Sequence, residues 1–577
     1  MLDKRGQRMN RRFTRILYAA TACMVVVTAP VLAAKKKRPE GVPAPQQPAT
    51  DQRPAPAAPQ PPPPETGAPP SKILENALKL YDREDYYMAS IELDKVVERK
   101  TGDDEGNVQR AEYFMAKTLE KLRFYSASLS YFNRIVEKGP AHRYYQKTLQ
   151  WLASLSRVLP ESSGVLEKIG KYNRQDLEQP FFDTVVDGDK VRNELYYLLG
   201  RFHYTKGNFK EALELFGLVP MDSKFYSRAK FLEGITHVRQ YDGKAAAESF
   251  RQILRKAREA PDKTSAEFEE LANLSLARVF YSTKQYPLSI KYYDRVPPES
   301  PDWLASLFES SWARFQIDDF SRALGNIHTI NAPFFENEFF PESLILKAVI
   351  YFQLCDYDRA METIKEFNDT YPALREEILA VIRKYPDNAE FYDYVKKIRS
   401  GEAGLSDRVQ RAVEGALQDR TLTKTLDYVA ELERELRQVD KADPNWKSTQ
   451  IAGTVLQDLT LQKSIAADEA GKLARKRLER LAGEIQELIK QAIKVEYETL
   501  NGRKGMLEAS IRGEQIQVSG AARKATVITT DDEHLLWPFR GEYWKDELGY
   551  YRFKIQNKCE AAKGSNAPAG TVVTPAN

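Results

Sequence analysis

Histidines and cysteines are the side chains of this sequence that most often bind metals. No two histidines stand at a ligand spacing such as H-E-x-x-H, and there is no C-x-x-C pair, so the sequence does not predict a zinc site. An isolated histidine on a helix is typical of a packing or surface position. The five histidines are His142, His203, His237, His328 and His534.

Motifs that bind phosphates or activate nucleophiles are also missing, including G-x-x-x-x-G-K-[ST], G-x-G-x-x-G and G-x-S-x-G. Two acidic runs, Asp318-Asp319 and Asp531-Asp532-Glu533, could exchange protons, but at turns such residues are typical of solvated or helix-capping groups. A hydrolase would need its catalytic residues between 525 and 559, where His534 would be the first to test. We therefore expect no catalytic residue, no metal, no cofactor and no enzyme activity.

The elements that could position binding residues come from an internal repeat of about 34 residues. In its clearest unit the small Gly200 lets two helices approach and Tyr204 fills the space between them. Gly207 then turns the chain, Ala212 gives close packing, and Phe216 fills the next interface. Each residue type therefore has a steric reason at its position.

Seven such units lie between residues 71 and 380. The small residues of the second helices at 212, 246, 289, 323 and 360 are 34, 43, 34 and 37 residues apart. The 84 residues between Ser128 and Ala212 leave room for one degenerate unit around 151–169. This pattern resembles the tetratricopeptide repeat, which implies an all-α fold with helix pairs stacked into a solenoid.

The resemblance also implies that the first helix of each pair lines a concave groove that binds proteins or peptides. Tyr, Trp and Arg are the residue types most useful as interface anchors. Helical spacing would equally place several of these side chains in the core, and both interpretations stay open. The groove candidates are Tyr197, Arg201, Tyr204, Arg278, Tyr281, Trp312 and Phe315.

The apolar spacing over residues 405–510 predicts long helices. They are interrupted at Asp443-Pro444-Asn445, where Pro444 is well placed to begin a new helix. The second helix carries a strict 4,3 seam typical of a coiled coil. The short turn favours an intramolecular antiparallel hairpin over a dimer. The seam is Ala474, Leu478, Leu481, Ile485, Leu488, Ala492 and Val495, and the expected partner stripe is Leu422, Leu426, Val429, Leu436 and Val439.

An aromatic-rich C-terminal segment, 525–559, contains Gly and Pro among its aromatic residues, which suggests turns that join short extended pieces. We expect it to pack as a cap, and we expect residues 560–577 to be disordered. Cys355 and Cys559 lie too far apart in sequence for a disulfide to be inferred. One buried thiol and one thiol in the tail is the simplest interpretation.

Residues 1–33 are typical of an export signal, because Arg11, Arg12 and Arg15 precede an apolar run that ends in small residues near Ala33. Cleavage there, a retained membrane anchor and lipid attachment at Cys23 all stay open. Residues 34–70 form a proline-rich stretch that we expect to be a disordered linker.

The formal net charge is +4, but residues 1–33 contribute +5, which leaves −1 for the rest of the chain. A nucleic-acid partner therefore has no electrostatic basis. The order of segments resembles exported tetratricopeptide proteins of the gliding-motility machinery of myxobacteria. That resemblance implies a periplasmic or outer-membrane-associated scaffold of a Gram-negative bacterium, which binds other envelope proteins or peptides and belongs to a membrane complex. A scaffold for pilus, secretion or cell-wall assembly, or a structural protein that lies close to peptidoglycan, is the alternative.

Overall fold

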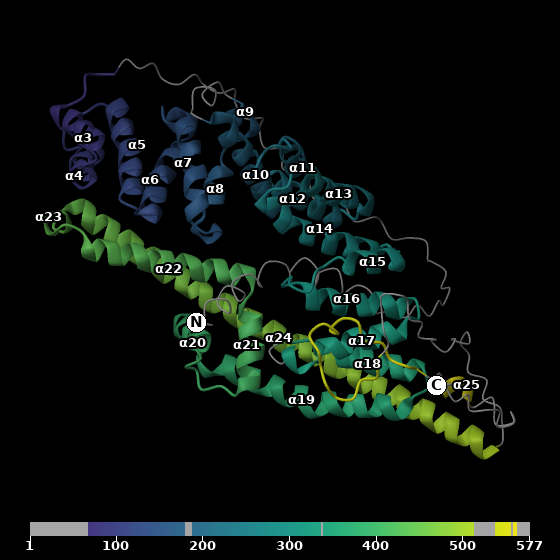
Figure 1. The fold of residues 1–577 in the computed structure, drawn as a ribbon. Coiled ribbons are helices and arrows are strands. Elements are labelled where there is room, and N and C mark those ends of the chain that lie inside the picture. Colours follow the sequence, from purple (N-terminus) through teal and green to yellow (C-terminus); the bar gives the residue numbers. More distant parts are fainter. Residues whose placement is uncertain (1–66, 179–186, 336–337, 513–536, 556–557, 562–577) are drawn as a thin grey trace, which may run out of the picture. The chain divides into compact units, whose positions relative to one another are not determined.

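The structure is a computed structural model, and it describes residues 67–178, 187–335, 338–512, 537–555 and 558–561. All regular elements in these ranges are helices, which confirms the predicted all-α fold (Figure 1). The expected signal at 1–33, the linker up to residue 66, residues 525–536 and residues 562–577 lie outside the described part. The described chain divides into an N-terminal unit, 67–219 with 430–463, and a C-terminal unit, 220–429 with 464–561.

Helix pairs build the first part of the N-terminal unit. The predicted degenerate unit is present, and its second helix, α8, has only five residues. A short helix, α9 (Arg174–Leu177), and the 3-10 turn η1 (Gly139–Ala141) connect pairs, whereas the 3-10 turn η2 (Glu161–Ser163) lies inside the degenerate pair. The pairs are α3 (Lys72–Asp82) with α4 (Tyr86–Val97), α5 (Glu105–Lys121) with α6 (Tyr125–Lys138), α7 (Tyr145–Val158) with α8 (Val165–Ile169), and α10 (Gly188–Lys206) with α11 (Phe209–Gly217).

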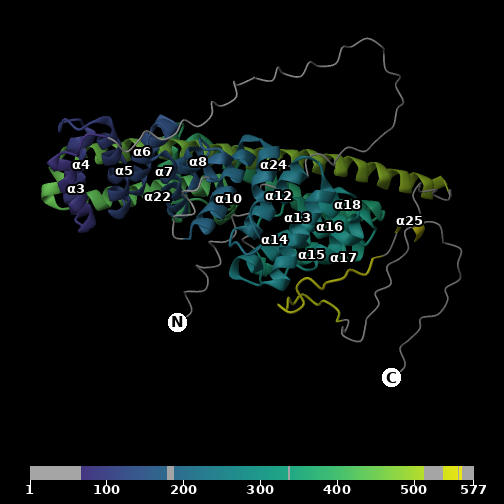
Figure 2. The ribbon, with the colours of Figure 1, turned by 90° about the horizontal axis from the view of Figure 1, so that it is seen from above.

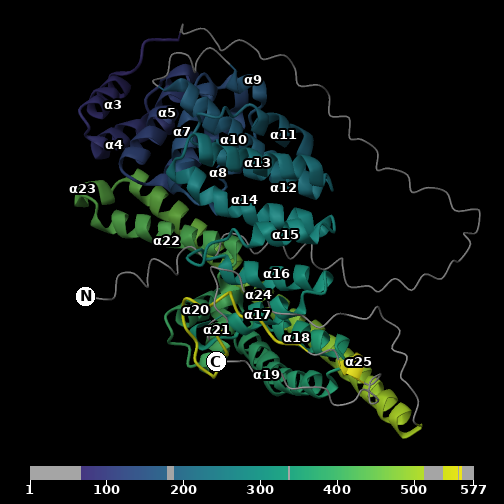
Figure 3. The same ribbon diagram turned by 45° about the vertical axis from the view of Figure 1, so that its right-hand side comes forward.

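The C-terminal unit continues the same pattern, with successive pairs stacked side by side (Figure 3). Its last repeat helix, α19, runs on through Pro372, where the repeat pattern fades in the sequence. The 3-10 turn η4 (Pro333–Phe335) precedes the last pair. The pairs are α12 (Tyr226–Arg239) with α13 (Gly243–Glu259), α14 (Lys263–Ser282) with α15 (Tyr286–Tyr293), α16 (Trp303–Gln316) with α17 (Phe320–Ile330), and α18 (Glu342–Gln353) with α19 (Tyr357–Lys384).

Close approach of the paired helices depends on the small residues that the repeat pattern singled out. A Cβ added at Gly200 would lie 2.8 Å from the ring of Phe216, and one added at Gly234 would lie 2.6 Å from the ring of Phe250. Both phenylalanines are fully buried. The glycine of the first helix and the aromatic ring of the second are therefore one packing unit.

The turn inside each regular pair places one residue in the left-handed region. Gly207 occupies this position between α10 and α11, with φ of 80°. In the other regular pairs a residue with a side chain adopts the same conformation, at a cost that glycine avoids. These residues are Glu84, Arg123, Tyr241, Lys284, Asp318 and Cys355.

After two connecting helices, α20 (Asn388–Arg399) and α21 (Asp407–Leu417), the chain forms the predicted hairpin of α22 (Arg420–Lys441) and α24 (Gln450–Arg512). The turn between them contains α23 (Pro444–Lys447), which Asp443 caps and Pro444 begins, as expected. Lys463 forms an ion pair of 3.3 Å with Glu433 across the two long helices. Both helices contribute residues to both units.

Within the N-terminal unit, the hairpin packs against the second helices of the first two repeats, α4 and α6 (Figure 1). Trp446 of α23 is 1% exposed, stacks on Phe124 with ring centroids 5.6 Å apart, and meets Tyr87 edge-on at 5.4 Å. Its indole Nε1 donates to Ser90 Oγ over 2.9 Å. A single aromatic residue thus anchors the turn of the hairpin on the repeats.

Within the C-terminal unit, the Leu488–Ala492 part of the coiled-coil seam of α24 has a different partner from the one predicted. Leu488 and Ala492 join a buried cluster with α18 and α19. Arg475 donates to the carbonyls of Ile382 and Tyr385 over 3.0 and 2.7 Å, and so caps the end of α19. This part of the seam is buried because the repeat helices cover it, which a 4,3 spacing alone does not distinguish from pairing with α22.

The C-terminal residues 537–555, here called the strap, contain no regular helix or strand and pack along α17. The backbone N–H of Phe553 donates to the carbonyl of Ser321 over 3.2 Å, and the hydroxyl of Ser321 donates to the carbonyl of Phe553 over 2.8 Å. Beyond the strap, Cys559 in the short helix α25 (Lys558–Ala561) forms a disulfide with Cys355. This disulfide corrects the expectation of two separate thiols, since the fold brings together residues 204 positions apart.

Candidate protein-binding surface

Four aromatic rings surround one lysine on the first helices of three consecutive repeats. The lysine is Lys117 of α5, and its Nζ atom faces rings from α3, α5 and α7. Nζ lies 4.4 Å from the centroid of Phe114, 4.7 Å from Tyr81, 5.5 Å from Trp151 and 5.6 Å from Tyr113. Such distances fit cation–π attraction. We call these five residues the lysine–aromatic cluster.

The rings of the cluster hold one another in place. Tyr81 meets Phe114 at right angles with centroids 5.2 Å apart. Trp151 donates from Nε1 to the hydroxyl of Tyr113 over 2.8 Å, and Tyr113 stacks on Tyr144 at 4.5 Å. Edge-to-face and offset-stacked pairs are favoured arrangements of aromatic rings, so the cluster is pre-organised.

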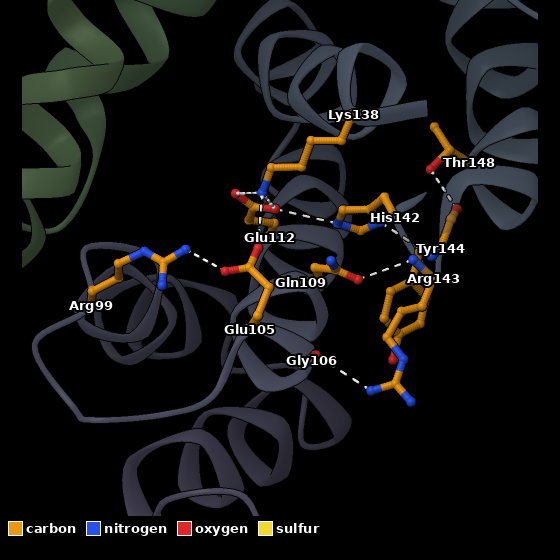
Figure 4. A network of polar contacts seen from close by, with 10 residues as sticks. All are labelled: Arg99, Glu105, Gly106, Gln109, Glu112, Lys138, His142, Arg143, Tyr144 and Thr148. Atoms are coloured by element: carbon orange, nitrogen blue, oxygen red, sulfur yellow. Dashed lines mark hydrogen bonds and ion pairs between the residues drawn. The ribbon is translucent and has the colours of Figure 1, made fainter. Parts of the chain in front are cut away.

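A polar network beneath the cluster joins α5 to the chain that enters α7 (Figure 4). The buried His142 accepts at Nδ1 from the backbone of Tyr144 over 3.1 Å, which leaves Nε2 to donate to Glu112 over 3.3 Å. Lys138 donates to the same carboxylate over 2.8 Å. Burial works against the charge of Glu112, but the hydrogen bonds from His142 and Lys138 outweigh it and lower the pKa of Glu112. The network thereby fixes the spacing of the first helices.

The surface of the cluster combines apolar rings with a partly desolvated cation. Phe114, Lys117 and Trp151 are half-buried, so each still presents atoms to a partner. Burial lowers the pKa of Lys117, since the rings replace water around the ammonium group. Chemically this surface suits a protein segment that places a carboxylate or backbone carbonyls beside apolar side chains.

The predicted groove residues of α10 lie at partly exposed positions. Tyr197, Arg201 and Tyr204 are all half-buried. Arg201 forms an ion pair with Glu161 of η2. The ring of Tyr204 lies 6.2 Å from that of Phe209 and so helps to close the turn to α11. The structure places the three on one helix and does not bring them into the lysine–aromatic cluster.

Arg278, another predicted groove residue, takes part in a buried network between repeats. Its guanidinium donates two hydrogen bonds to Glu309, of 2.8 and 2.6 Å, and Tyr293 donates to the same carboxylate over 2.9 Å. Burial opposes the charge of Arg278, but Glu309 outweighs it and holds the pKa of Arg278 above its ordinary value. The network joins α14, α15 and α16.

The remaining predicted residues pack next to turns and clusters of the C-terminal unit. Tyr281 meets Tyr286 edge-on at 5.5 Å, and burial raises the pKa of Tyr281 to about 12. Trp312 and Phe315 are partly buried against the core cluster of α17 and α18. Their positions serve helix packing, and each still has an exposed fraction.

Sequence reasoning did not place Tyr81 or Trp151 in a binding site. A usable signal existed for Tyr81, because it follows Ala77 by one turn as Tyr204 follows Gly200. No such signal marked Trp151, since its unit is degenerate and the pattern gives no register there.

Two further features bear on the chemistry of the described residues. No group of three His, Cys, Asp or Glu side chains among them could hold a metal ion. None of the helices that the structure describes has the length and apolar character to cross a membrane.

Comparison with known protein families identifies part of the repeat region. Residues 231–302 match the family model described as tetratricopeptide repeat, which confirms the predicted repeats in this range. No curated protein matches the chain. A tetratricopeptide repeat protein from Parabacteroides merdae is 15% identical over 52% of this chain and 91% of that chain, with a TM-score of 0.26. The apo form of RapI is 12% identical over 60% of this chain and 96% of that one, with a TM-score of 0.33.

Proposed function

We propose that this tetratricopeptide-repeat chain is a non-enzymatic scaffold that holds partner proteins in the cell envelope through its lysine–aromatic cluster. The observation that carries the proposal is the position of the cluster, on the first helices α3, α5 and α7. The hairpin covers the second helices α4 and α6 instead, so it leaves the surface of the first helices to a partner. Partly exposed Trp and Tyr side chains are the residues most often found as anchors of protein interfaces.

Export to an oxidising compartment is supported by two independent features. The first is the Cys355–Cys559 disulfide, because structural disulfides are typical of proteins that mature outside the reducing cytosol. Residues 1–33 have the charge and apolar pattern of an export signal. The proposed location is therefore periplasmic or outer-membrane-associated in a Gram-negative bacterium.

The proposed partners are other envelope proteins, and within this class a gliding-motility complex is the narrower proposal. It rests on the order of segments in the sequence, namely signal, proline-rich stretch, repeats, hairpin and aromatic C-terminal segment. Pilus, secretion or cell-wall assembly proteins would bind through the same surface. Binding to peptidoglycan itself would be shown by co-sedimentation with purified sacculi.

In-cell crosslinking of the full chain, followed by purification from the envelope fraction of its native host, tests the proposal. We expect Lys117→Glu with Trp151→Ala to lose at least one reproducibly captured partner. Lys79→Glu, the same charge change at an exposed position of α3, should keep it. Helical content measured by circular dichroism checks that the variants fold.

The identity of the captured partners decides between the narrower proposals. Motility-complex subunits would support the gliding scaffold, whereas secretion or wall-synthesis proteins alone would contradict it. If partners were lost only after combined substitution of Tyr197, Arg201 and Tyr281, the binding site would lie outside the lysine–aromatic cluster. Unchanged capture in all variants would contradict a groove-binding scaffold.

A further inference from the structure

The C-terminal part of α24 has one face that the chain already uses. Leu488 and Ala492 pack against α18 and α19 in a buried cluster. Further along, a Cβ added at Gly502 would lie 2.7 Å from the ring of Tyr357, and Thr499 is fully buried. This inner face holds the helix on the repeats of the C-terminal unit.

The outer face of the same segment carries a second row of large apolar side chains, and these are exposed. Together with Lys504 they follow a 4,3 spacing, which places them on one stripe of the helix as in a coiled coil. A regular exposed row of this kind marks an interaction surface. The apolar residues are Ile493, Tyr497, Leu500, Leu507 and Ile511, with exposed fractions of 58, 66, 48, 58 and 85%. We call them, with Lys504, the outer seam.

We propose that the outer seam binds the outer seam of a second copy of this chain, with the two α24 helices antiparallel. The six seam positions are spaced equally on the two sides of residue 502. An antiparallel second copy therefore places each seam residue opposite another seam residue. Figure 2 shows the C-terminal end of α24 extending beyond α18. The layers are Ile493 with Ile511, Tyr497 with Leu507, and Leu500 with Lys504.

The position of Lys504 inside the seam favours the antiparallel arrangement over the parallel one. In the antiparallel register Lys494 of one copy flanks the core opposite Glu508 of the other, and the symmetry makes this attraction twice. Lys504 then packs its aliphatic stem on Leu500 of the other copy while its ammonium group reaches water. A parallel pair would instead place Lys504 against Lys504 inside the seam, which is repulsive.

Cysteine crosslinking of the full chain tests the arrangement directly, with Cys23→Ser in every variant to remove the free thiol. We expect Tyr497→Cys and Leu507→Cys to form a disulfide-linked dimer when the two proteins are mixed, because they share a layer, and not when each is oxidised alone. Crosslinking of each variant with itself would show a parallel pair and overturn the proposal. Absence of any crosslink would also overturn it.

Sedimentation velocity of the purified full chain at increasing concentration gives an independent readout. We expect a monomer–dimer equilibrium that Leu500→Glu with Leu507→Glu abolishes. Ile465→Glu serves as control, because Ile465 is exposed on α24 but lies outside the seam. Lys494→Glu should raise the Kd by roughly threefold to tenfold, and adding Glu508→Lys should restore it. A wild-type chain that stays monomeric at all concentrations would overturn the proposal.

Discussion

A single buried carboxyl group, that of Glu435 on α22, couples the stability of the N-terminal unit to pH. Its side chain is fully buried, and Oε1 accepts from the backbone of Ser126 over 2.8 Å. Burial raises the pKa of Glu435 to about 8. The folded chain therefore keeps a proton that the unfolded chain releases above its ordinary pKa, so the contribution of Glu435 to stability is greatest below that ordinary pKa and falls as pH rises to about 8.

Replacement of Glu435 by glutamine should remove this pH dependence, because the amide keeps the shape of the protonated acid. Between about pH 5 and pH 8 the wild type should lose up to ~1.4 kcal/mol per pH unit relative to Glu435→Gln. Urea unfolding at four pH values measures the difference. Asp440→Asn, at an exposed position of the same helix, should leave the wild-type slope unchanged. Equal slopes in wild type and Glu435→Gln would contradict a buried protonated acid.

Arg278 shows how a residue with the chemistry of an interface anchor can instead join repeats. Glu309→Gln should cost roughly 3–5 kcal/mol, because it leaves the guanidinium buried without its carboxylate. The double variant Arg278→Met with Glu309→Gln should recover part of this loss, since it removes the unpaired charge. Guanidinium chloride unfolding measures both. A double variant less stable than Glu309→Gln alone would show that Arg278 contributes through its other contacts.

At the scale of elements, residues with a side chain in the left-handed region make the turns inside the helix pairs less stable than glycine would. Lys284 is exposed and adopts φ of 61°, a conformation that costs a residue with a Cβ about 1 kcal/mol relative to glycine. Lys284→Gly should therefore stabilise the C-terminal unit by up to ~1 kcal/mol. Gly207→Ala, at the same turn position with φ of 80°, should destabilise the N-terminal unit by a similar amount. Thermal unfolding of both variants measures these opposite shifts, and shifts of the same sign would contradict the argument.

At the scale of the whole molecule, the Cys355–Cys559 disulfide links the C-terminal segment covalently to the last repeat. Lys558 adds an ion pair of 2.7 Å with Asp356 next to the bridge. A cross-link that closes a loop of about two hundred residues stabilises mainly by restricting the unfolded chain, by about 5 kcal/mol. The double variant Cys355→Ser with Cys559→Ser should lose this contribution.

Reduction offers the matched experiment for the disulfide. Dithiothreitol should lower the urea midpoint of the wild type and should expose the strap to limited proteolysis. The serine double variant should show both effects without the reductant and should not respond to it. A wild type whose midpoint and cleavage pattern are the same with and without dithiothreitol would contradict a stabilising bridge.

The sequence by itself determined the features that depend on local spacing. Small and aromatic residues at a period of about 34 predicted the helix pairs, and Gly200 and Phe216 indeed meet as one packing unit. Pro444 predicted the start of a helix, because proline fits the first helical turn, where its missing N–H is not needed.

Only the tertiary structure decided which distant surfaces meet. The seam of α24 is apolar whether it faces α22 or α18 and α19, since burial needs only a complementary surface. The sequence leaves open whether Arg278 lies in an interface or between repeats, and the structure shows that it bonds to Glu309 of the next repeat. Cys355 and Cys559 became a pair because the strap runs along α17, and Trp151 joined Lys117 because α7 packs beside α5. Contacts between segments far apart in the chain leave no periodic trace in the sequence, so spacing could not reveal them.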